Sequence, residues 1–190
     1  MSNQAKNIVV SCALAVAGMA CSAYAQAPAS AGADATVVAN PTYVSIPLEI
    51  TVNRPAAEVW KRVGKFCDIG EWLQIPCKIV SGNDGDFGAV RSVAGEVLVG
   101  KTELSYTYTQ TVKAGRPYNL YHGTLEARPV TAATSKLVYT LMFDNSMLAD
   151  DAARQKDREQ KTALFNRALQ NMKTLAEGGT LPPPPARGGR

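Results

Sequence analysis

The sequence predicts an α+β fold, in which a strongly bent antiparallel sheet of about seven strands wraps on one long C-terminal helix and two short helices follow the first strand. Three observations lead to this prediction. Between residues 43 and 144, short stretches alternate apolar and polar residues and are separated by turn-forming residues, as half-buried strands are. Two short helical patterns follow the first of these stretches. The charged segment 148–177 carries an apolar stripe, which it can bury only against the concave face of the sheet.

The first strand and the two short helices are predicted within residues 43–73. Residues 43–52 alternate and end at Asn53-Arg54-Pro55, where Asn53 can cap a helix and Pro55 suits a first helical turn. Apolar residues then recur at helical spacing, namely Val59, Trp60, Val63 and Phe66. A second short helix is expected over 68–73, because Pro76 follows soon after it.

The rest of the domain is predicted as six strands and the long helix. The strands are expected around 78–81, 89–94, 96–99, 103–112, 118–128 and 135–144, with turns at NDGDFG, KAGRP and RPVTAA. The apolar stripe of the final helix consists of Leu164, Ala168, Met172 and Leu175.

Residues 1–25 are typical of a secretion signal. Lys6 gives a positive start, and 8–20 is an apolar run too short to span a bilayer. Ala23-Tyr24-Ala25 places small residues where a signal peptidase reads them, with cleavage after Ala25. A lipidated Cys21 is the competing interpretation, but the residues before it form a poor lipoprotein signal. We therefore expect a secreted or periplasmic protein.

The segments on either side of the domain lack the pattern of a packed core. Residues 26–40 are rich in Ala and Ser and are predicted to be a flexible leader. The domain itself is expected over 41–178. Residues 179–190 are rich in Pro and Gly and are predicted to be a disordered tail.

Cleavage would leave two cysteines, Cys67 and Cys77. In an exported chain we expect them to form one disulfide, which stabilises the fold by about 2–3 kcal/mol. A zinc site is the alternative, but His122 is the only histidine and structural zinc usually takes four cysteine or histidine ligands. The sequence therefore predicts no metal, and no motif in it indicates a cofactor.

The charge pattern argues against two classes of partner. The formal net charge of +4 is small and the basic residues are scattered, so nucleic acid is not expected as a partner. The mature chain is not expected to insert stably into a membrane. The oligomeric state is left open by the sequence.

Tyrosines gather on one face of three neighbouring predicted strands, beginning with LSYTYT at 104–109. They are Tyr106, Tyr108, Tyr121 and Tyr139, and the opposite faces are mostly polar and include His122. A buried phenol needs a hydrogen-bond partner, so four of them with Gly123 leaving space favour a polar-rimmed cavity. Plain core packing is the alternative, and His122 is interpreted as a solvated surface residue.

Several local sequences occur in a familiar order. They are RPAAEVWKRVGKFCDIGEW after the first strand, GAVRSV on the third, LSYTY on the fifth, YHGTLEARPV on the sixth and KLVYTLMFD on the seventh. Over residues 41–177 the chain resembles the START-like, helix-grip (SRPBCC) superfamily of birch-pollen-allergen proteins, plant abscisic acid receptors and bacterial polyketide cyclase/dehydrase and lipid transport proteins. The resemblance implies a deep cavity between the sheet and the long helix, filled by one small hydrophobic or aromatic ligand.

The resemblance also implies candidate site residues. Arg91 lies on the third strand and Glu96 follows the turn beside the cavity mouth, where the first could hold an anion and the second could move a proton. A surface ion pair worth less than about 1 kcal/mol is the alternative for this pair. The candidate catalytic residues are Glu96, Arg91, Tyr106 and Tyr121. The candidate ligand-binding residues are Leu73, Tyr108, Gly123, Tyr139, Leu164, Ala168 and Met172, with Gln160 as a polar neighbour.

Leu73 marks a departure from the plant receptors, which carry a carboxylate-binding lysine at the corresponding position. A neutral or phenolic ligand therefore suits this chain better than a carboxylic acid.

Two classes of function remain open. In the first, the protein is an exported enzyme that performs cofactor-independent acid–base chemistry of the cyclase, dehydratase or carbon–carbon lyase type on an aromatic or polyketide-like compound. In the second, it is a periplasmic carrier or sensor of a small hydrophobic ligand or lipid, without turnover. The convergence of proton-transferring groups favours the first slightly. A buried carboxylate facing the tyrosines would favour the enzyme, and a neutral cavity would favour the carrier.

Overall fold

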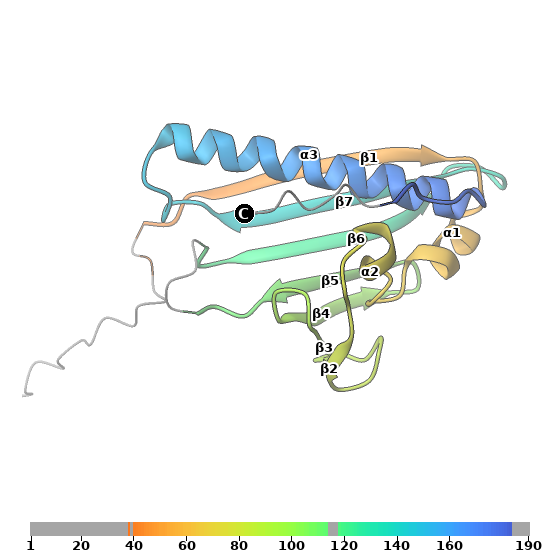
Figure 1. Cartoon of the computed structure of the whole chain (residues 1–190), viewed down its shortest axis with the longest axis horizontal. Coiled ribbons are helices and arrows are strands. Elements are labelled where there is room, and N and C mark those ends of the chain that lie inside the picture. Colours follow the sequence, from red (N-terminus) through yellow and green to blue (C-terminus); the bar gives the residue numbers. More distant parts are fainter. Residues whose placement is uncertain (1–37, 39, 114–117, 184–190) are drawn as a thin grey trace, which may run out of the picture. The chain divides into compact units, whose positions relative to one another are not determined.

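The computed structural model describes residue 38 and residues 40–113 and 118–183 (Figure 1). Seven strands form one antiparallel sheet in the order β1-β7-β6-β5-β4-β3-β2. The elements are β1 (Tyr43–Val52), α1 (Ala56–Val63), α2 (Ile69–Trp72), β2 (Ile79–Ser81), β3 (Val90–Arg91), β4 (Glu96–Thr102), β5 (Ser105–Gln110), β6 (Tyr121–Pro129), β7 (Ser135–Asp144) and α3 (Asp151–Ala176). The predicted α+β fold and its element order are confirmed. The predicted secretion signal, nearly all of the leader and the end of the tail lie outside the described residues.

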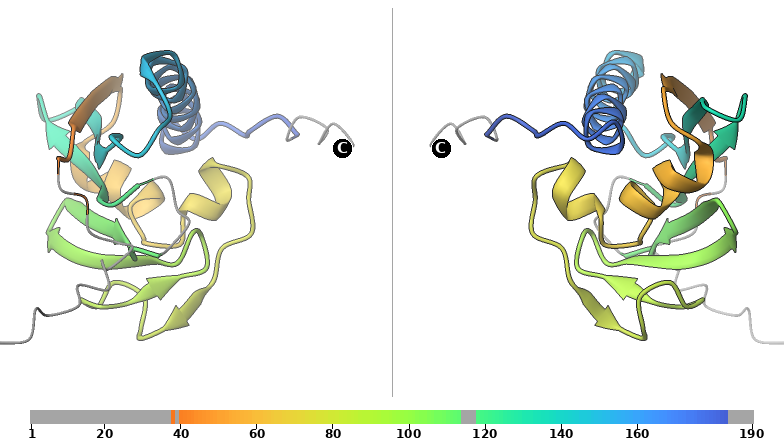
Figure 2. Two further views of the ribbon diagram at one scale, coloured as in Figure 1. Left: turned by 90° about the vertical axis from the view of Figure 1, so that its left-hand side faces the viewer. Right: turned by 90° about the vertical axis from the view of Figure 1, so that its right-hand side faces the viewer.

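The sheet curls so that its concave side holds α1 and α2, while α3 lies beside β1 and β7 (Figure 2). The longest pairings are β1 with β7 and β6 with β7, which run in continuous register. The buried residues of α3 face the concave side of the sheet and include Phe165, Leu169 and Met172. The helix therefore buries one apolar face against the sheet, but the residues on this face are not all those of the predicted stripe.

The helix starts differ from the sequence prediction. Asn53 does not cap α1, because Pro55 occupies the N-cap position and no side chain bonds there. The backbone N–H of Asn53 instead donates to Glu177 Oε1 at 2.8 Å and ties the end of β1 to the end of α3. The long helix starts three residues later than predicted, because the Asp150 carboxylate accepts from the N–H of Ala153 at 2.7 Å and caps it.

The β2–β4 edge of the sheet is shorter and more irregular than predicted. β2 has three residues and β3 has two. Ala94 and Gly95 both have positive φ, 53° and 68°, and make the tight turn into β4. Within β4 the register shifts between Leu98 and Gly100, so Val99 forms a bulge. Beyond this bulge Lys101 pairs with Tyr106, whose side chain lies on the concave side of the sheet.

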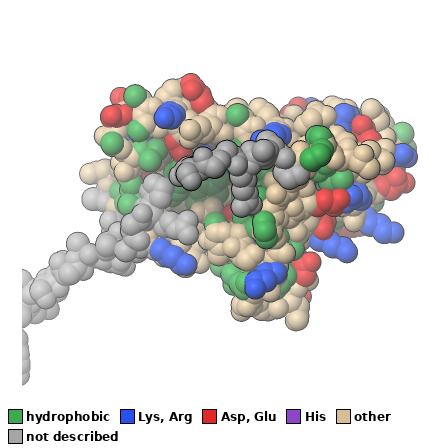
Figure 3. All heavy atoms as spheres, viewed as in Figure 1, with side chains coloured by type: hydrophobic (Ala, Val, Ile, Leu, Met, Phe, Trp, Pro, Cys, Tyr) green, Lys and Arg blue, Asp and Glu red, His purple; other side chains and the backbone are tan. Residues whose placement is uncertain are grey.

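The predicted disulfide joins Cys67 to Cys77, with their Cα atoms 5.7 Å apart, and encloses α2. It fixes the segment that carries Phe66 beside the β3–β4 edge. None of the described helices has the length and apolar character needed to cross a membrane. On the face drawn in Figure 3, basic and acidic side chains are interspersed.

Candidate ligand-binding site

The four predicted inner tyrosines are all buried, with exposed fractions between 0% and 7%. Tyr108 and Tyr139 hydrogen-bond to each other through their hydroxyls at 3.0 Å. The Tyr139 ring also packs on Phe165 of α3, with centroids 4.6 Å apart. Burial raises the pKa of both phenols well above its usual value, so they stay protonated and neutral. These two hydroxyls therefore satisfy each other within the core.

Gly123 does not leave space for a ligand, and this part of the prediction is wrong. The ring of Tyr108 fills the position: a Cβ atom on Gly123 would lie 2.4 Å from Tyr108 ring atoms and hydroxyl. The glycine lets the tyrosine of the neighbouring strand lie flat against the backbone of β6.

The inward face of α3 is shifted from the prediction. Ala168 and Met172 are fully buried, as expected, but Leu164 is 38% exposed and Gln160 is exposed. Leu164 and Gln160 are therefore not part of a cavity roof. Phe165 takes the inward position, because the helix continues its buried stripe through Leu169 at a spacing of four.

Arg91 and Glu96 form a buried ion pair, so the surface-pair alternative is wrong. Arg91 is 0% and Glu96 3% exposed. Arg91 Nε donates to Glu96 Oε2 at 2.6 Å, and Nη2 lies 2.6 Å from the same oxygen but outside hydrogen-bond geometry. Nη1 donates to the carbonyl of Phe66 at 2.5 Å, and Gln110 donates to Glu96 Oε1 at 3.2 Å. Both carboxylate oxygens are thus occupied by protein donors.

Aromatic rings enclose the Arg91 guanidinium. Its carbon lies 4.3 Å from the ring centroid of Phe66, 4.7 Å from that of Tyr108 and 5.7 Å from that of Tyr106. Burial by itself lowers the pKa of Arg91, but the electrostatic effects of Tyr106 and Glu96 outweigh it and the pKa is raised. Burial raises the pKa of Glu96 above its usual value, against the opposing effect of Arg91 and Gln110.

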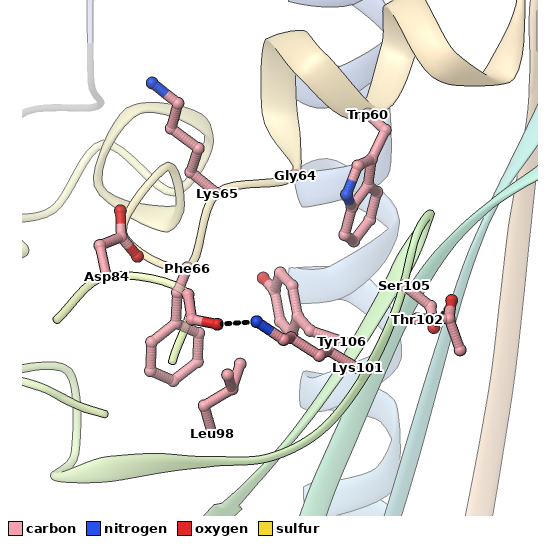
Figure 4. Close-up of a pocket in the computed structure, with 11 residues that line it drawn as sticks. Trp60, Gly64, Lys65, Phe66, Asp84, Leu98, Lys101, Thr102, Ser105 and Tyr106 are labelled. Atoms are coloured by element: carbon pink, nitrogen blue, oxygen red, sulfur yellow. Dashed lines mark hydrogen bonds between the residues drawn. The ribbon is translucent and has the colours of Figure 1, made fainter. Parts of the chain in front are cut away.

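A pocket of about 350 Å³ opens next to this ion pair, between the end of α1, the turn at residues 84–85 and the β4–β5 hairpin (Figure 4). Its wall is aromatic: the ring centroids of Trp60 and Phe66 lie 5.7 and 5.5 Å from that of Tyr106. Leu98 adds an apolar floor. Tyr106 separates the pocket from Arg91, whose Nη1 is 3.5 Å from the tyrosine hydroxyl.

The position of this pocket differs from the cavity expected beneath the long helix, because no residue of α3 lines it. It opens beside β4 and the loop between β2 and β3. The bulge at Val99 directs Lys101 to this side, where its Nζ donates to the carbonyl of Gly85 at 2.5 Å (dashed in Figure 4). Lys101 therefore holds the turn at the pocket rim.

The other residues singled out in the sequence lie in three places. Leu73 ends α2 and is partly buried against the core. His122 lies on the outer face of β6, as predicted, and partial burial lowers its pKa. Tyr121 lies away from Arg91: its ring stacks on Phe143 with centroids 5.7 Å apart, so it does not line the pocket.

Sequence reasoning missed a polar cluster near Tyr121. Lys161 of α3 contacts the Asp157 carboxylate and the Tyr118 hydroxyl, and Tyr118 donates to Asp157. The spacing of four between Asp157 and Lys161 was visible in the sequence, but most such pairs on helices are solvated. Nothing in the sequence brings Tyr118 to them.

A family profile described as "polyketide cyclase / dehydrase and lipid transport" matches residues 43–177. The chain belongs to this family. It is thus a helix-grip protein of a family associated with small hydrophobic ligands, in agreement with the resemblance noted above. A search of curated proteins found no match.

Solved structures share the fold at low sequence identity. A protein from Thermobifida fusca superposes with a TM-score of 0.59 and 23% identity, covering 72% of this chain and 97% of its own. Truncated norcoclaurine synthase from Thalictrum flavum gives a TM-score of 0.54 and 11% identity, covering 76% of this chain and 99% of its own. The Zhui aromatase/cyclase from Streptomyces sp. R1128 gives a TM-score of 0.51 and 18% identity, covering 73% of this chain and 100% of its own. These likenesses show the fold alone.

Proposed function

We propose that the protein is an exported carrier or sensor that binds a small aromatic or polyketide-like molecule in the pocket walled by Trp60, Phe66 and Tyr106, without turnover. The observation that carries this proposal is the aromatic wall around an open space of about 350 Å³. Such a volume lies at the lower end of the range for ligand pockets and suits a compound of few rings. Aromatic faces bind it by stacking and by removal of apolar surface from water.

The positions of the proton-transferring groups support binding without turnover. Glu96 does not line the pocket, and its two oxygens already accept hydrogen bonds from Arg91 and Gln110. Tyr106 does line it, but burial raises the pKa of its phenol, which leaves it a hydrogen-bond donor and not a base. A phenolic or carbonyl oxygen of a ligand is a suitable acceptor for this hydroxyl.

Export is supported by the Cys67–Cys77 disulfide, because disulfides persist mainly in oxidising compartments. Mass spectrometry of periplasmic or secreted material tests it directly. The mature chain should begin at Gln26 and contain no free thiol. A chain that keeps Lys6, or that has two free thiols, would contradict export.

The binding proposal is tested with the mature protein and a panel of phenolic and polyketide-like compounds. Native mass spectrometry should show one bound molecule per chain, and the compound recovered after long incubation should be unchanged. Recovery of a cyclised, dehydrated or cleaved product would overturn the carrier interpretation.

One observation favours a second candidate, the cofactor-independent acid–base enzyme. Glu96 is a buried carboxylate with a raised pKa next to Arg91, and four phenols share its side of the sheet. In this case wild-type protein should form product while Glu96→Gln binds the compound without converting it. Equal product formation by both proteins would exclude Glu96 as the acid or base.

A further inference from the structure

The cluster around Lys161 lies outside the aromatic pocket, and none of its residues lines that pocket. The Lys161 side chain is 12% exposed and that of Asp157 16% exposed. Lys161 Nζ lies 4.2 Å from the ring centroid of Tyr118, 4.8 Å from that of Phe143 and 5.9 Å from that of Tyr121. An amine is thus held among three aromatic rings and is largely buried.

Two groups next to the amine have the roles that amine chemistry requires. Asp157 contacts Nζ and can accept its proton, and Tyr118 contacts the same nitrogen and can donate a proton. Burial lowers the pKa of Lys161, with Asp157 opposing this effect, so more of the amine is neutral than in an exposed lysine. Burial and Asp157 raise the pKa of Tyr118, which keeps its phenol protonated.

We propose that Lys161 captures a small aldehyde or ketone with an aromatic body as a Schiff base, assisted by Tyr118 and Asp157. The site takes a carbonyl compound because a nucleophilic nitrogen, a proton donor and a proton acceptor meet at one point. It takes an aromatic one because the partly exposed ring of Tyr118, whose centroid is 4.2 Å from Nζ, supplies aromatic surface next to the amine.

The step is balanced without an oxidant or a reductant. The ammonium of Lys161 passes a proton to Asp157, and the nitrogen lone pair forms a bond to the carbonyl carbon. The carbon–oxygen π pair moves to oxygen, which takes a proton from Tyr118. The nitrogen then gives a proton back to the Tyr118 phenolate. The proton held by Asp157 passes to the hydroxyl group, which leaves as water while the nitrogen lone pair forms the carbon–nitrogen double bond of a protonated Schiff base.

The test is reductive trapping on the mature protein at neutral pH with 4-hydroxybenzaldehyde and cyanoborohydride, followed by peptide mapping. Lys156 lies on the same helix, is exposed and serves as the internal control. We expect labelling at Lys161 at least about tenfold faster than at Lys156. Equal rates at the two lysines, or no label on Lys161, would overturn the proposal.

Three variants separate the chemistry from simple exposure. Lys161→Arg should remove the fast label and leave the rate at Lys156 unchanged. Tyr118→Phe and Asp157→Asn keep the lysine and should slow its labelling towards the Lys156 rate. Unchanged Lys161 labelling in both would contradict the assigned proton transfers. Because each rate is read at one residue of one chain, the result does not depend on whether the aromatic pocket binds a ligand.

Discussion

Two aromatic clusters share Tyr106 and Phe66 and differ in what fills them. On the inner side, the rings of Phe66, Tyr106 and Tyr108 enclose the Arg91 guanidinium, which is fully buried. On the outer side, Phe66 and Tyr106 together with Trp60 face an open pocket. Around Arg91 these rings are structural, because the protein supplies the group that they enclose, whereas the rings that face the pocket are available to a ligand.

The difference indicates how the fold divides its polar groups. In the inner cluster, Tyr108 pairs with Tyr139 and Glu96 with Arg91, so hydrogen-bonding capacity is used within the chain. A buried pair of this kind is strongly destabilised by loss of one partner but tolerates joint replacement by apolar residues. The outer pocket should behave in the opposite way, with changes that affect binding and leave stability nearly unaltered. The predictions below follow from this contrast.

The largest expected effect is the loss of one member of the buried ion pair. Arg91→Ala leaves the Glu96 carboxylate buried without its partner and should lower the free energy of unfolding by about 3–5 kcal/mol. Urea denaturation of the mature chain measures it. The joint replacement Arg91→Met with Glu96→Leu should cost much less than the single change. A double variant as unstable as Arg91→Ala would show that the pair is not an isolated electrostatic unit.

A smaller loss is expected from filling the contact between β5 and β6. In Gly123→Ala the new methyl group meets the Tyr108 ring at 2.4 Å, and this overpacking should cost about 1–3 kcal/mol. Gly100→Ala is the matched control, since its nearest neighbour would be Thr107 at 3.4 Å, and its unfolding midpoint should change less. A neutral Gly123→Ala would mean that the interior has room for a guest after all.

The hydroxyl pair in the core gives the next smaller effect. Tyr108→Phe leaves the Tyr139 hydroxyl buried without its partner and should cost about 1 kcal/mol. The double change to Phe at both positions removes both hydroxyls and should cost less than the sum of the two single changes. Additive losses in thermal denaturation would show that the two hydroxyls do not depend on each other.

Much of this architecture could be predicted from alternation along the strands. The inner positions of Tyr106, Tyr108 and Tyr139 could be predicted, because the side chains of a strand alternate strictly between its two faces. This alternation cannot show that Tyr108 fills the space above Gly123, because that depends on how two strands approach each other. A stripe of leucine and alanine also fails to fix the phase of α3, where Phe165 and not Leu164 turned inward.

The pocket itself could not be predicted from sequence periodicity. Its rim is formed by Lys101, which the bulge at Val99 moves to the concave side, and by residues 84–85 in the loop between β2 and β3. Bulges and strand ends depend on pairing with distant residues and leave little signal in one strand. The Lys161 cluster was missed for a related reason, because Tyr118 reaches it across 43 residues of sequence.

The two tryptophans of the chain report separately on the aromatic pocket and on the core beneath α3. Trp60 stands in the pocket wall, whereas Trp72 is fully buried beside Tyr139, with ring centroids 6.2 Å apart. The variant Trp72→Phe keeps only the fluorescence of Trp60, and the variant Trp60→Phe keeps only that of Trp72. Titration of both variants with a bound phenolic compound should change the emission of Trp60 and leave that of Trp72 unaltered. A response confined to Trp72 would place the ligand beneath α3 and contradict the assignment of the aromatic pocket.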